Sequence, residues 1–343
     1  MSPSRSPASP VRRVRVETTA RLHLGFIDLT RRRSRQFGSL GLALAAPATT
    51  VTVSAGGTAA PLPAEVADTV RAAAEHFGVE MPTAVTVDEA IPRHAGLGSG
   101  TQRALAVAAA VAGLSGRDPD ARELAAATGR GRRSGIGIGT YRAGGFVVDG
   151  GRSAAANSPP VIARVAFPEP WRVVLLTDPD FEGLSGSSEN AAFDSLPGMA
   201  TTVANELAYL TLMGILPALH EHDFLTFARA VGRIQTANGD HFASAQNGRY
   251  ASAKVAEAIA LLSEAGHVGL GQSSWGPTGF VFAPDAMTAE EVAALVEARF
   301  ACGELVPRIA RARNEGAKIE RDSHAAAGPA EADWPEAAGT RSA

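Results

Sequence analysis

The chain has 343 residues, of which 45% are hydrophobic and 20% charged, and its formal net charge is −3. These values are typical of a globular protein long enough for two lobes, and they exclude a strongly basic surface for nucleic acid. The single cysteine, Cys302, excludes internal disulfides and cysteine-based zinc sites, and it fits a reducing, cytoplasmic location. No apolar stretch approaches the length of a membrane span, so no membrane partner is expected.

The N-terminal half of the chain alternates strand patterns with helix patterns. Residues 1–10 are rich in Ser and Pro and predict a disordered leader. Period-two alternation predicts strands over 11–17, 49–53 and 83–87, and apolar spacing predicts helices over 64–77 and 102–112. Asp118-Pro119 is expected to open a third helix, which Gly129 ends. The glycine density of residues 135–151 predicts weak strands with close backbone approach.

The C-terminal half is mainly helical. A candidate lobe boundary at 157–160 is followed by a buried strand over 171–177 and by four helices over 201–214, 223–236, 251–265 and 288–300. The last helix opens with Thr288-Ala-Glu-Glu291, a capping box. A polar, Gly-rich loop over 269–278 precedes a strand over 279–283. We therefore expect an α+β fold with an N-terminal lobe over 11–160, a C-terminal lobe over 161–318 and a disordered tail over 319–343.

The most informative segment is Pro92-Arg-His-Ala-Gly-Leu-Gly-Ser-Gly-Thr101, which lies directly before an Ala-rich helix. Glycines allow a tight turn and a close approach to a ligand, and a helix N-terminus offers unpaired N–H groups and partial positive charge. The segment therefore predicts a phosphate-binding loop formed by Gly96, Gly98, Ser99, Gly100 and Thr101, with a plain helix cap as the alternative. It lacks the P-loop and dinucleotide-binding patterns. It resembles the phosphate loop of the GHMP superfamily, which includes galacto-, homoserine, mevalonate and phosphomevalonate kinases.

This resemblance implies a two-lobed GHMP-kinase-like α+β fold. The N-terminal lobe would carry the phosphate loop, the C-terminal lobe would be ferredoxin-like, and the site would lie between them. GHMP kinases usually carry a catalytic aspartate in a segment that corresponds to Ser134–Gly145, where this chain has no acid and has Thr140 or Tyr141 instead. Their third motif, a loop of small residues, is here Gly271-Gln-Ser-Ser-Trp-Gly-Pro-Thr-Gly279 and contains an indole. We infer that the scaffold was kept while the chemistry changed.

With these departures, the chain resembles the β-ribofuranosylaminobenzene 5′-phosphate synthases over about residues 15–318. Five segments carry the resemblance: Arg21-Leu-His-Leu-Gly-Phe-Ile-Asp28, Phe37-Gly-Ser-Leu-Gly41, Gly135-Ile-Gly-Ile-Gly-Thr140, Gly144-Gly-Phe-Val-Val-Asp149 and Gly271-Gln-Ser-Ser-Trp-Gly-Pro-Thr278. The family condenses phosphoribosyl pyrophosphate (PRPP) with 4-aminobenzoate, releasing CO2 and pyrophosphate, in tetrahydromethanopterin biosynthesis. The sequence leaves 4-hydroxybenzoate open as the acceptor. It also leaves open an ATP-dependent small-molecule kinase and a non-catalytic phosphometabolite-binding protein.

The matched segments supply the candidate site residues. The candidate catalytic residues are Arg21, Asp28, Thr140 and Trp275. The candidate substrate- and phosphate-binding residues are His23, Gly96, Gly98, Ser99, Gly100, Thr101, Arg133, Gln272, Ser273 and Ser274, with Arg35, Arg130 and Arg132 as further phosphate candidates. Arginine forks bind phosphate bidentately, and an indole or Tyr141 would contact the aromatic acceptor.

The sequence also supports expectations about a metal ion and about the oligomeric state. Mg²⁺ or Mn²⁺ is expected to accompany the pyrophosphate of PRPP, with Asp28 and Asp149 as candidate ligands; each carboxylate would also suit a structural turn. His220-x-His222 lacks a third ligand nearby in the sequence, which argues against zinc. The Ala-rich helices would suit a homodimer.

Overall fold

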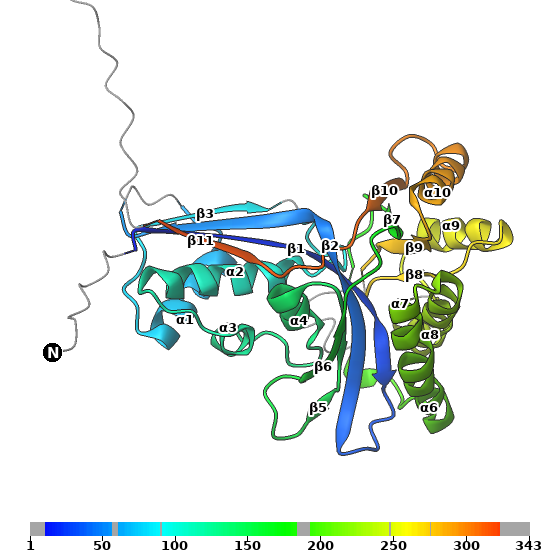
Figure 1. The fold of residues 1–343 in the computed structure, drawn as a ribbon, viewed down its shortest axis with the longest axis horizontal. Coiled ribbons are helices and arrows are strands. Elements are labelled where there is room, and N and C mark those ends of the chain that lie inside the picture. Colours follow the sequence, from blue (N-terminus) through cyan, green and yellow to red (C-terminus); the bar gives the residue numbers. More distant parts are fainter. Residues whose placement is uncertain are drawn as a thin grey trace, which may run out of the picture.

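The computed structural model describes residues 11–56, 61–89, 91–183, 193–246, 248–274 and 276–322 (Figure 1). Two long strands, β1 (Arg13–Asp28) and β2 (Arg35–Ser54), run through the centre of the molecule. The predicted leader, most of the predicted tail and Trp275 lie outside the described residues.

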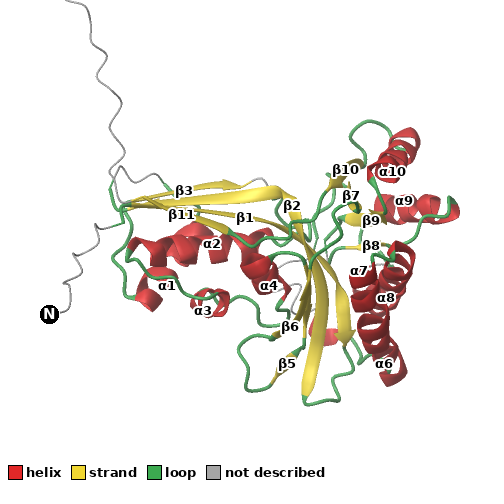
Figure 2. Ribbon diagram, viewed as in Figure 1, coloured by secondary structure: helices red, strands yellow, loops and turns green. Residues whose placement is uncertain are grey.

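The N-terminal lobe is built on a sheet with the strand order β11-β1-β2-β4-β6, in which β3 and β5 also pair with β2. Helices α1 to α4 cover one face of this sheet (Figure 2). The strands added to β1 and β2 are β3 (Ala84–Glu89), β4 (Phe146–Asp149), β5 (Arg152–Ser153), β6 (Val161–Val165) and β11 (Lys318–Asp322). The helices are α1 (Ala64–Phe77), α2 (Ser99–Leu114), α3 (Ala121–Ala127) and α4 (Ile136–Ala143). Helix α2 is buried along almost its whole length, because its Ala and Val side chains pack between the sheet and α1.

The C-terminal lobe has a four-stranded antiparallel sheet with the order β10-β7-β9-β8. Numbered along the chain within this lobe, that order is 4-1-3-2, which is the ferredoxin-like arrangement and confirms the predicted fold class. The strands are β7 (Arg172–Thr177), β8 (Leu270–Gln272), β9 (Gly279–Ala283) and β10 (Val306–Ala310). The helices are α6 (Thr201–Tyr209), α7 (Leu216–Glu221), α8 (Phe224–Gln246), α9 (Ala253–Glu264) and α10 (Ala286–Arg299), with a π-helical segment, η1 (Leu210–Ile215), between α6 and α7.

The lobe boundaries differ from those predicted. Strand β6 was assigned to the second lobe, but it pairs with β4 in the first sheet. Residues 319–322 were assigned to a disordered tail, but they belong to β11, which pairs with β1 from Arg13↔Asp322 to Glu17↔Lys318. The chain thus returns to the first lobe because β11 satisfies the backbone hydrogen bonds along the outer edge of β1. Its charged, mostly exposed residues suit an edge strand.

Residues 136–143 form helix α4 and not the predicted weak strand. The glycines of this segment lie within the helix, where their lack of a side chain leaves room for neighbouring elements. A Cβ atom on Gly137 would lie 2.8 Å from Cγ2 of Thr101, and one on Gly139 would lie 2.6 Å from Cγ1 of Val147. The glycines therefore let α4 press closely against α2 and β4.

Two predicted helix starts are one to three residues off. The cap of α3 is Asp120, whose carboxylate accepts from the amides of Arg122 and Glu123, so Asp118 does not open the helix. The cap of α10 is Asp285, which accepts from the amide of Thr288, so no capping box begins at that threonine. In both cases an Asp close to the predicted cap residue caps the helix instead.

The predicted helix over 201–214 continues to Glu221. It widens to a π-helix at Leu210–Ile215, just before Pro217, which lacks the amide hydrogen that a regular α-helix needs there. By length and composition the run Thr201–Glu221 could cross a membrane, contrary to the sequence expectation; 33% of its apolar window is buried. Its buried residues recur every three or four positions and pack into the core, as in an amphipathic helix of a folded domain: Ala204, Leu207, Thr211, Ile215, Ala218 and Leu219.

Candidate functional site

A bulge in β1 places the first site residues. Arg21 and His23 are two residues apart on the strand, so both side chains lie on the same face. The pairing register with β2 shifts between His23 and Phe26, and Gly25 in the bulge has φ +114°. Asn238 of α8 holds this bulge: its Oδ1 accepts from the Phe26 amide at 2.8 Å and its Nδ2 donates to the Phe26 carbonyl at 3.0 Å. A helix of the second lobe thus fixes the strand that carries the site.

The glycine loop packs directly against Arg21. Gly98, with φ +83°, is the cap residue of α2, which begins at Ser99. The Arg21 amide donates to the Leu97 carbonyl at 3.0 Å, and its Nη1 donates to the Gly96 carbonyl at 2.5 Å. The loop therefore precedes a helix N-terminus, as predicted, and a guanidinium lies beside it.

Three segments distant in sequence meet at this point. Ser273 Oγ donates to the Gly96 carbonyl at 2.8 Å and accepts from the His23 amide at 3.0 Å. This one hydroxyl links β1, the glycine loop and the loop after β8. The structure thus brings together residues 21–23, 96–101 and 272–274, which the sequence analysis had placed in one site.

A cleft of about 450 Å³ opens beside this junction. Four of its lining residues are arginines, Arg21, Arg130, Arg132 and Arg133, and none of the described lining residues is an acid. The remaining lining residues are His23, Phe26, Thr101, Gly129, Gly131, Ser134, Gly137 and Ser274. The volume suits a small ligand, and the charge suits one that carries several phosphates. We call this space the arginine cleft.

His23 forms a buried wall of the arginine cleft. Its side chain is 4% exposed, and its ring centroid lies 4.7 Å from that of Phe26. Burial, with help from the nearby guanidinium groups of Arg21 and Arg133, lowers the pKa of His23 to about 3. The imidazole is therefore neutral at physiological pH.

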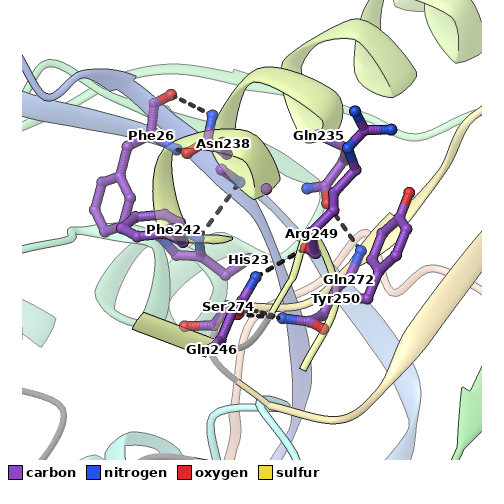
Figure 3. Close-up of a pocket in the computed structure, with 12 residues that line it drawn as sticks. His23, Phe26, Gln235, Asn238, Phe242, Gln246, Arg249, Tyr250, Gln272 and Ser274 are labelled. Atoms are coloured by element: carbon purple, nitrogen blue, oxygen red, sulfur yellow. Dashed lines mark hydrogen bonds between the residues drawn. The ribbon is translucent and has the colours of Figure 1, made fainter. Parts of the chain in front are cut away.

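A small polar cavity of about 30 Å³ lies on the other side of His23 (Figure 3). Its wall on α8 is formed by Gln235, Asn238, Gly239, Phe242 and Gln246, and Arg249 and Tyr250 follow that helix. The sequence analysis missed these residues because it ended this helix at residue 236, before Asn238, and assigned no role to Gln235. The polar residues Gln235, Asn238 and Gln246 are interrupted by Gly239 and Phe242, so no regular polar repeat marked the wall.

Gln272 organises this region and does not line the arginine cleft. It is 6% exposed; its Oε1 accepts from the Ala251 amide at 2.7 Å, and its Nε2 donates to Gln246 Oε1 at 3.2 Å and to the Ser274 carbonyl at 3.1 Å. Its amide donates to Gln235 Oε1 at 2.8 Å. These bonds shape the loop that begins at Ser273.

The two candidate metal ligands lie away from the arginine cleft. Asp149 is fully buried and accepts hydrogen bonds from Ser39 Oγ, from the Gly135 amide at 2.8 Å and from the Gly151 amide at 2.9 Å. Burial raises the pKa of this carboxyl group. Both carboxylate oxygens thus have hydrogen-bond partners, and the group anchors the start of α4.

Asp28 has partners of its own. It accepts from the amide and hydroxyl of Thr30 at 2.9 and 2.7 Å, and its Oδ2 lies 3.3 Å from Arg33 Nη1. With Asp149 and Arg35 it lines a separate, mainly apolar cavity of about 460 Å³ between the first sheet and the α6–α7 run. Among the described residues no group of three His, Cys, Asp or Glu side chains could hold a metal ion. A metal role for Asp28 and Asp149 stays a prediction, and neither lines the arginine cleft.

Thr140 and Tyr141 also point away from the arginine cleft. Thr140 Oγ1 donates to the Ile136 carbonyl of its own helix at 2.9 Å and is 5% exposed. The Tyr141 ring packs in the core of the first lobe, and burial raises its pKa. Both were expected at the position of a kinase aspartate, but the first turn of α4 presents Gly137 to the cleft and buries the second turn. Thr140 therefore does not line the arginine cleft, and its catalytic role stays a prediction. Trp275, the remaining predicted catalytic residue, lies outside the described residues.

Comparison with known proteins identifies the class to which this fold and site belong. Residues 63–140 match the GHMP kinases N terminal domain, and residues 215–302 match the GHMP kinases C terminal domain. Homoserine kinase from Cytophaga hutchinsonii is similar in structure, with a TM-score of 0.64 at 15% identity over 92% of this chain and all of the kinase chain. Mevalonate-3-kinase from Thermoplasma acidophilum has a TM-score of 0.63 at 12% identity over 90% of this chain and 99% of its own. The chain has the GHMP kinase fold.

Relatives of similar sequence identify the family to which the chain belongs within this fold. The chain is 32% identical to beta-ribofuranosylphenol 5′-phosphate synthase of Methanothermobacter thermautotrophicus, over 76% of this chain and 86% of the relative. It is 36% identical to the enzyme of that name from Archaeoglobus fulgidus, over 65% of this chain and 75% of the relative. The chain belongs to the β-ribofuranosylphenol 5′-phosphate synthase family, a family of pentosyltransferase-type enzymes. This confirms the resemblance drawn from the five sequence segments.

Proposed function

We propose that the protein joins PRPP to a benzoate with an electron-donating para substituent, releasing CO2 and pyrophosphate. The acceptor is 4-aminobenzoate, the prediction from the sequence, or 4-hydroxybenzoate, the acceptor that the relatives' name suggests. The product would be the ribofuranosyl 5′-phosphate of an aniline or of a phenol, a C-ribosyl arene of the tetrahydromethanopterin type. The observation that carries this proposal is the arginine cleft beside the glycine loop, in which no described side chain is a carboxylate.

The charge of the cleft matches the donor. PRPP carries a 5′-phosphate and a pyrophosphate, and the cleft offers four guanidinium groups and the N-terminus of α2. Guanidinium groups bind phosphate oxygens bidentately, and backbone N–H groups at a helix start bind anions. We propose that Arg21 and the loop from Gly96 to Thr101 hold one phosphate group, and that Arg130, Arg132 and Arg133 hold the other.

The reaction needs no residue to remove a proton from carbon. The bond from ribose C1 to pyrophosphate breaks with its electron pair on pyrophosphate. The ring carbon that bears the carboxylate supplies an electron pair to ribose C1. The bond from that carbon to the carboxylate then breaks, its electron pair restores the aromatic ring, and CO2 leaves. A cleft without a carboxylate base is consistent with this sequence of steps, whereas a kinase needs a group that accepts the hydroxyl proton.

The chain contributes positioning and water exclusion. The Phe26 ring lies in the cleft next to the arginines and packs on the buried imidazole of His23. An aromatic acceptor held there would lie close to the donor, away from water that would hydrolyse it. We propose that Trp275 contacts the same acceptor, on the basis of its position in the loop after Ser274.

The two candidate metal ligands lie outside the arginine cleft. Asp149 is sealed by its own hydrogen bonds and Asp28 is paired with Arg33, and neither lines the arginine cleft. We therefore propose that Mg²⁺ or Mn²⁺ arrives on the pyrophosphate of PRPP. The exposed Cys302 agrees with the proposed cytoplasmic location.

The test uses carboxyl-labelled 4-aminobenzoate and 4-hydroxybenzoate in separate reactions with PRPP and Mg²⁺. One CO2 and one pyrophosphate per product molecule support the proposal, and the ratio of the two kcat/KM values identifies the preferred acceptor. Arg132→Gln should raise the KM for PRPP, whereas Arg71→Gln, an exposed arginine on α1, should not. ATP-dependent phosphorylation of an alcohol without CO2 release would instead establish the kinase.

A further inference from the structure

The Nε2 atom of His23 is buried without a hydrogen-bond partner among the described residues. A buried polar nitrogen without a hydrogen-bond partner is unusual, because burial removes its hydrogen bond to water and the protein supplies no replacement. His23 lines the arginine cleft and also the small polar cavity drawn in Figure 3. Nε2 itself has almost no exposed surface, so a ligand reaches it only when the side chains around it shift.

The other ring nitrogen identifies the tautomer. The Gly25 amide donates to His23 Nδ1 at 3.4 Å, within the bulge of β1. In a neutral imidazole one nitrogen accepts and the other carries the proton, so the proton is on Nε2. Nε2 is consequently a donor and requires an acceptor atom from the ligand.

The surroundings keep the ring neutral and attract anions. The titratable and charged groups that face His23 across the two spaces are Arg21 on β1, Arg130, Arg132 and Arg133 on the loop between α3 and α4, and Arg249 and Tyr250 after α8. The described lining residues of both spaces include no Asp or Glu. A second positive charge on the imidazole is therefore unfavourable, in agreement with its lowered pKa.

We propose that His23 donates a hydrogen bond from Nε2 to a phosphoryl oxygen of PRPP and takes no part in proton transfer. The strand places its imidazole on the same face as Arg21, beside the glycine loop, where the phosphate groups concentrate. A neutral donor adds a directional contact to an anion that the arginines attract by charge. The inference rests on the proposed function, because that function makes PRPP the ligand.

The test follows the imidazole directly, so that it does not depend on turnover. Protein with ¹⁵N-labelled histidine is titrated with inorganic pyrophosphate alone, and in a second arm with 4-hydroxybenzoate alone. We expect the His23 nitrogen pattern of the Nε2–H tautomer, unchanged from about pH 5.5 to about 8, and a shift of the Nε2–H signal on adding pyrophosphate.

Substitutions of His23 test the same contact through the affinity for pyrophosphate. His23→Leu should weaken pyrophosphate binding about tenfold or more, as for the loss of a hydrogen bond to a charged group, and should raise the KM for PRPP more than it lowers kcat. His23→Gln, whose amide can donate from a similar position, should recover most of that loss. His220→Gln, at the exposed end of α7, is the control and should bind pyrophosphate like the parent.

Four results would overturn the proposal. The first is titration of His23 between about pH 5.5 and about 8, and the second is a signal that pyrophosphate does not move, which would leave a buried water as the partner. The third is a signal moved only by the benzoate, which would make the acceptor carboxylate the ligand. The fourth is equal pyrophosphate affinity in His23→Leu. Failure of the proposed reaction is read separately, as absent CO2 release from a protein that still binds pyrophosphate.

Discussion

Gly98→Ala should weaken both donor binding and the fold, whereas a matched glycine that does not touch Arg21 should weaken the fold alone. Gly98 has φ +83°, a conformation that costs an L-residue about 1–2 kcal/mol. A Cβ atom there would lie 3.0 Å from Nε and 3.1 Å from Cζ of Arg21. The guanidinium must therefore move away from the loop to accommodate the methyl group.

Gly98→Ala has two expected effects, one on stability and one on donor binding. The free energy of unfolding should fall by about 1–2 kcal/mol from the backbone conformation. A hydrogen bond to a charged group is worth about 1.5–3 kcal/mol, so displacing Arg21 should raise the Kd for PRPP by about 10- to 150-fold. Gly78→Ala is the matched control, since Gly78 caps α1 with φ +61° and no heavy atom lies within 4 Å of its added Cβ. It should lower the free energy of unfolding by a similar amount, about 1–2 kcal/mol, and leave donor binding unchanged.

Isothermal titration with PRPP and urea unfolding of both variants provide the measurements. The expected result is an affinity loss of about tenfold or more in Gly98→Ala and the parent affinity in Gly78→Ala, with similar losses of stability in both. Folded Gly98→Ala protein with the parent affinity would show that the loop only caps α2. Equal losses in both variants would show that the contact with Arg21 is irrelevant to donor binding.

Three further predictions concern the buried carboxylate, the metal and the division of the site. Asp149→Asn should lower the free energy of unfolding by about 1–3 kcal/mol, because an amide replaces one acceptor oxygen among several donors. Since burial raises the folded-state pKa of Asp149, its contribution to stability should be largest below the ordinary carboxyl pKa and should fall as pH rises through the raised value. Chemical unfolding from acid to neutral pH should show this slope in the parent and not in the variant. EDTA should abolish activity and Mg²⁺ or Mn²⁺ should restore it, with no zinc found by elemental analysis; full activity after exhaustive chelation would contradict the metal on the substrate. Trp275→Ala should raise the KM for the benzoate several-fold, about 1 kcal/mol, whereas Arg21→Ala should raise the KM for PRPP; identical patterns with both substrates varied in turn would refute this division.

The sequence determined the identity of the fold and the location of the glycine loop. The glycine loop from Gly96 to Thr101 and the helix after it could be recognised because glycine content and helix periodicity are local properties. Helix α1 and strand β9 were predicted with their observed bounds for the same reason. The missing kinase aspartate could likewise be read from Ser134–Gly145 alone, and it separated this family from the kinases that share its fold.

Only the tertiary structure decided which side chains reach the arginine cleft. Asp149 and Thr140 lie in matched motifs, yet their partners are Ser39, Gly135 and Ile136, and the direction of each side chain follows from how α4 packs on β4. The wall of α8 was unpredictable because its polar residues acquire a role only when the bulge of β1 docks against Asn238. The return of β11 to the first sheet depends on an open strand edge far earlier in the chain, since Asp322 pairs with Arg13. Local patterns specify which elements form, whereas long-range hydrogen bonds and close packing specify which of their residues meet the substrate.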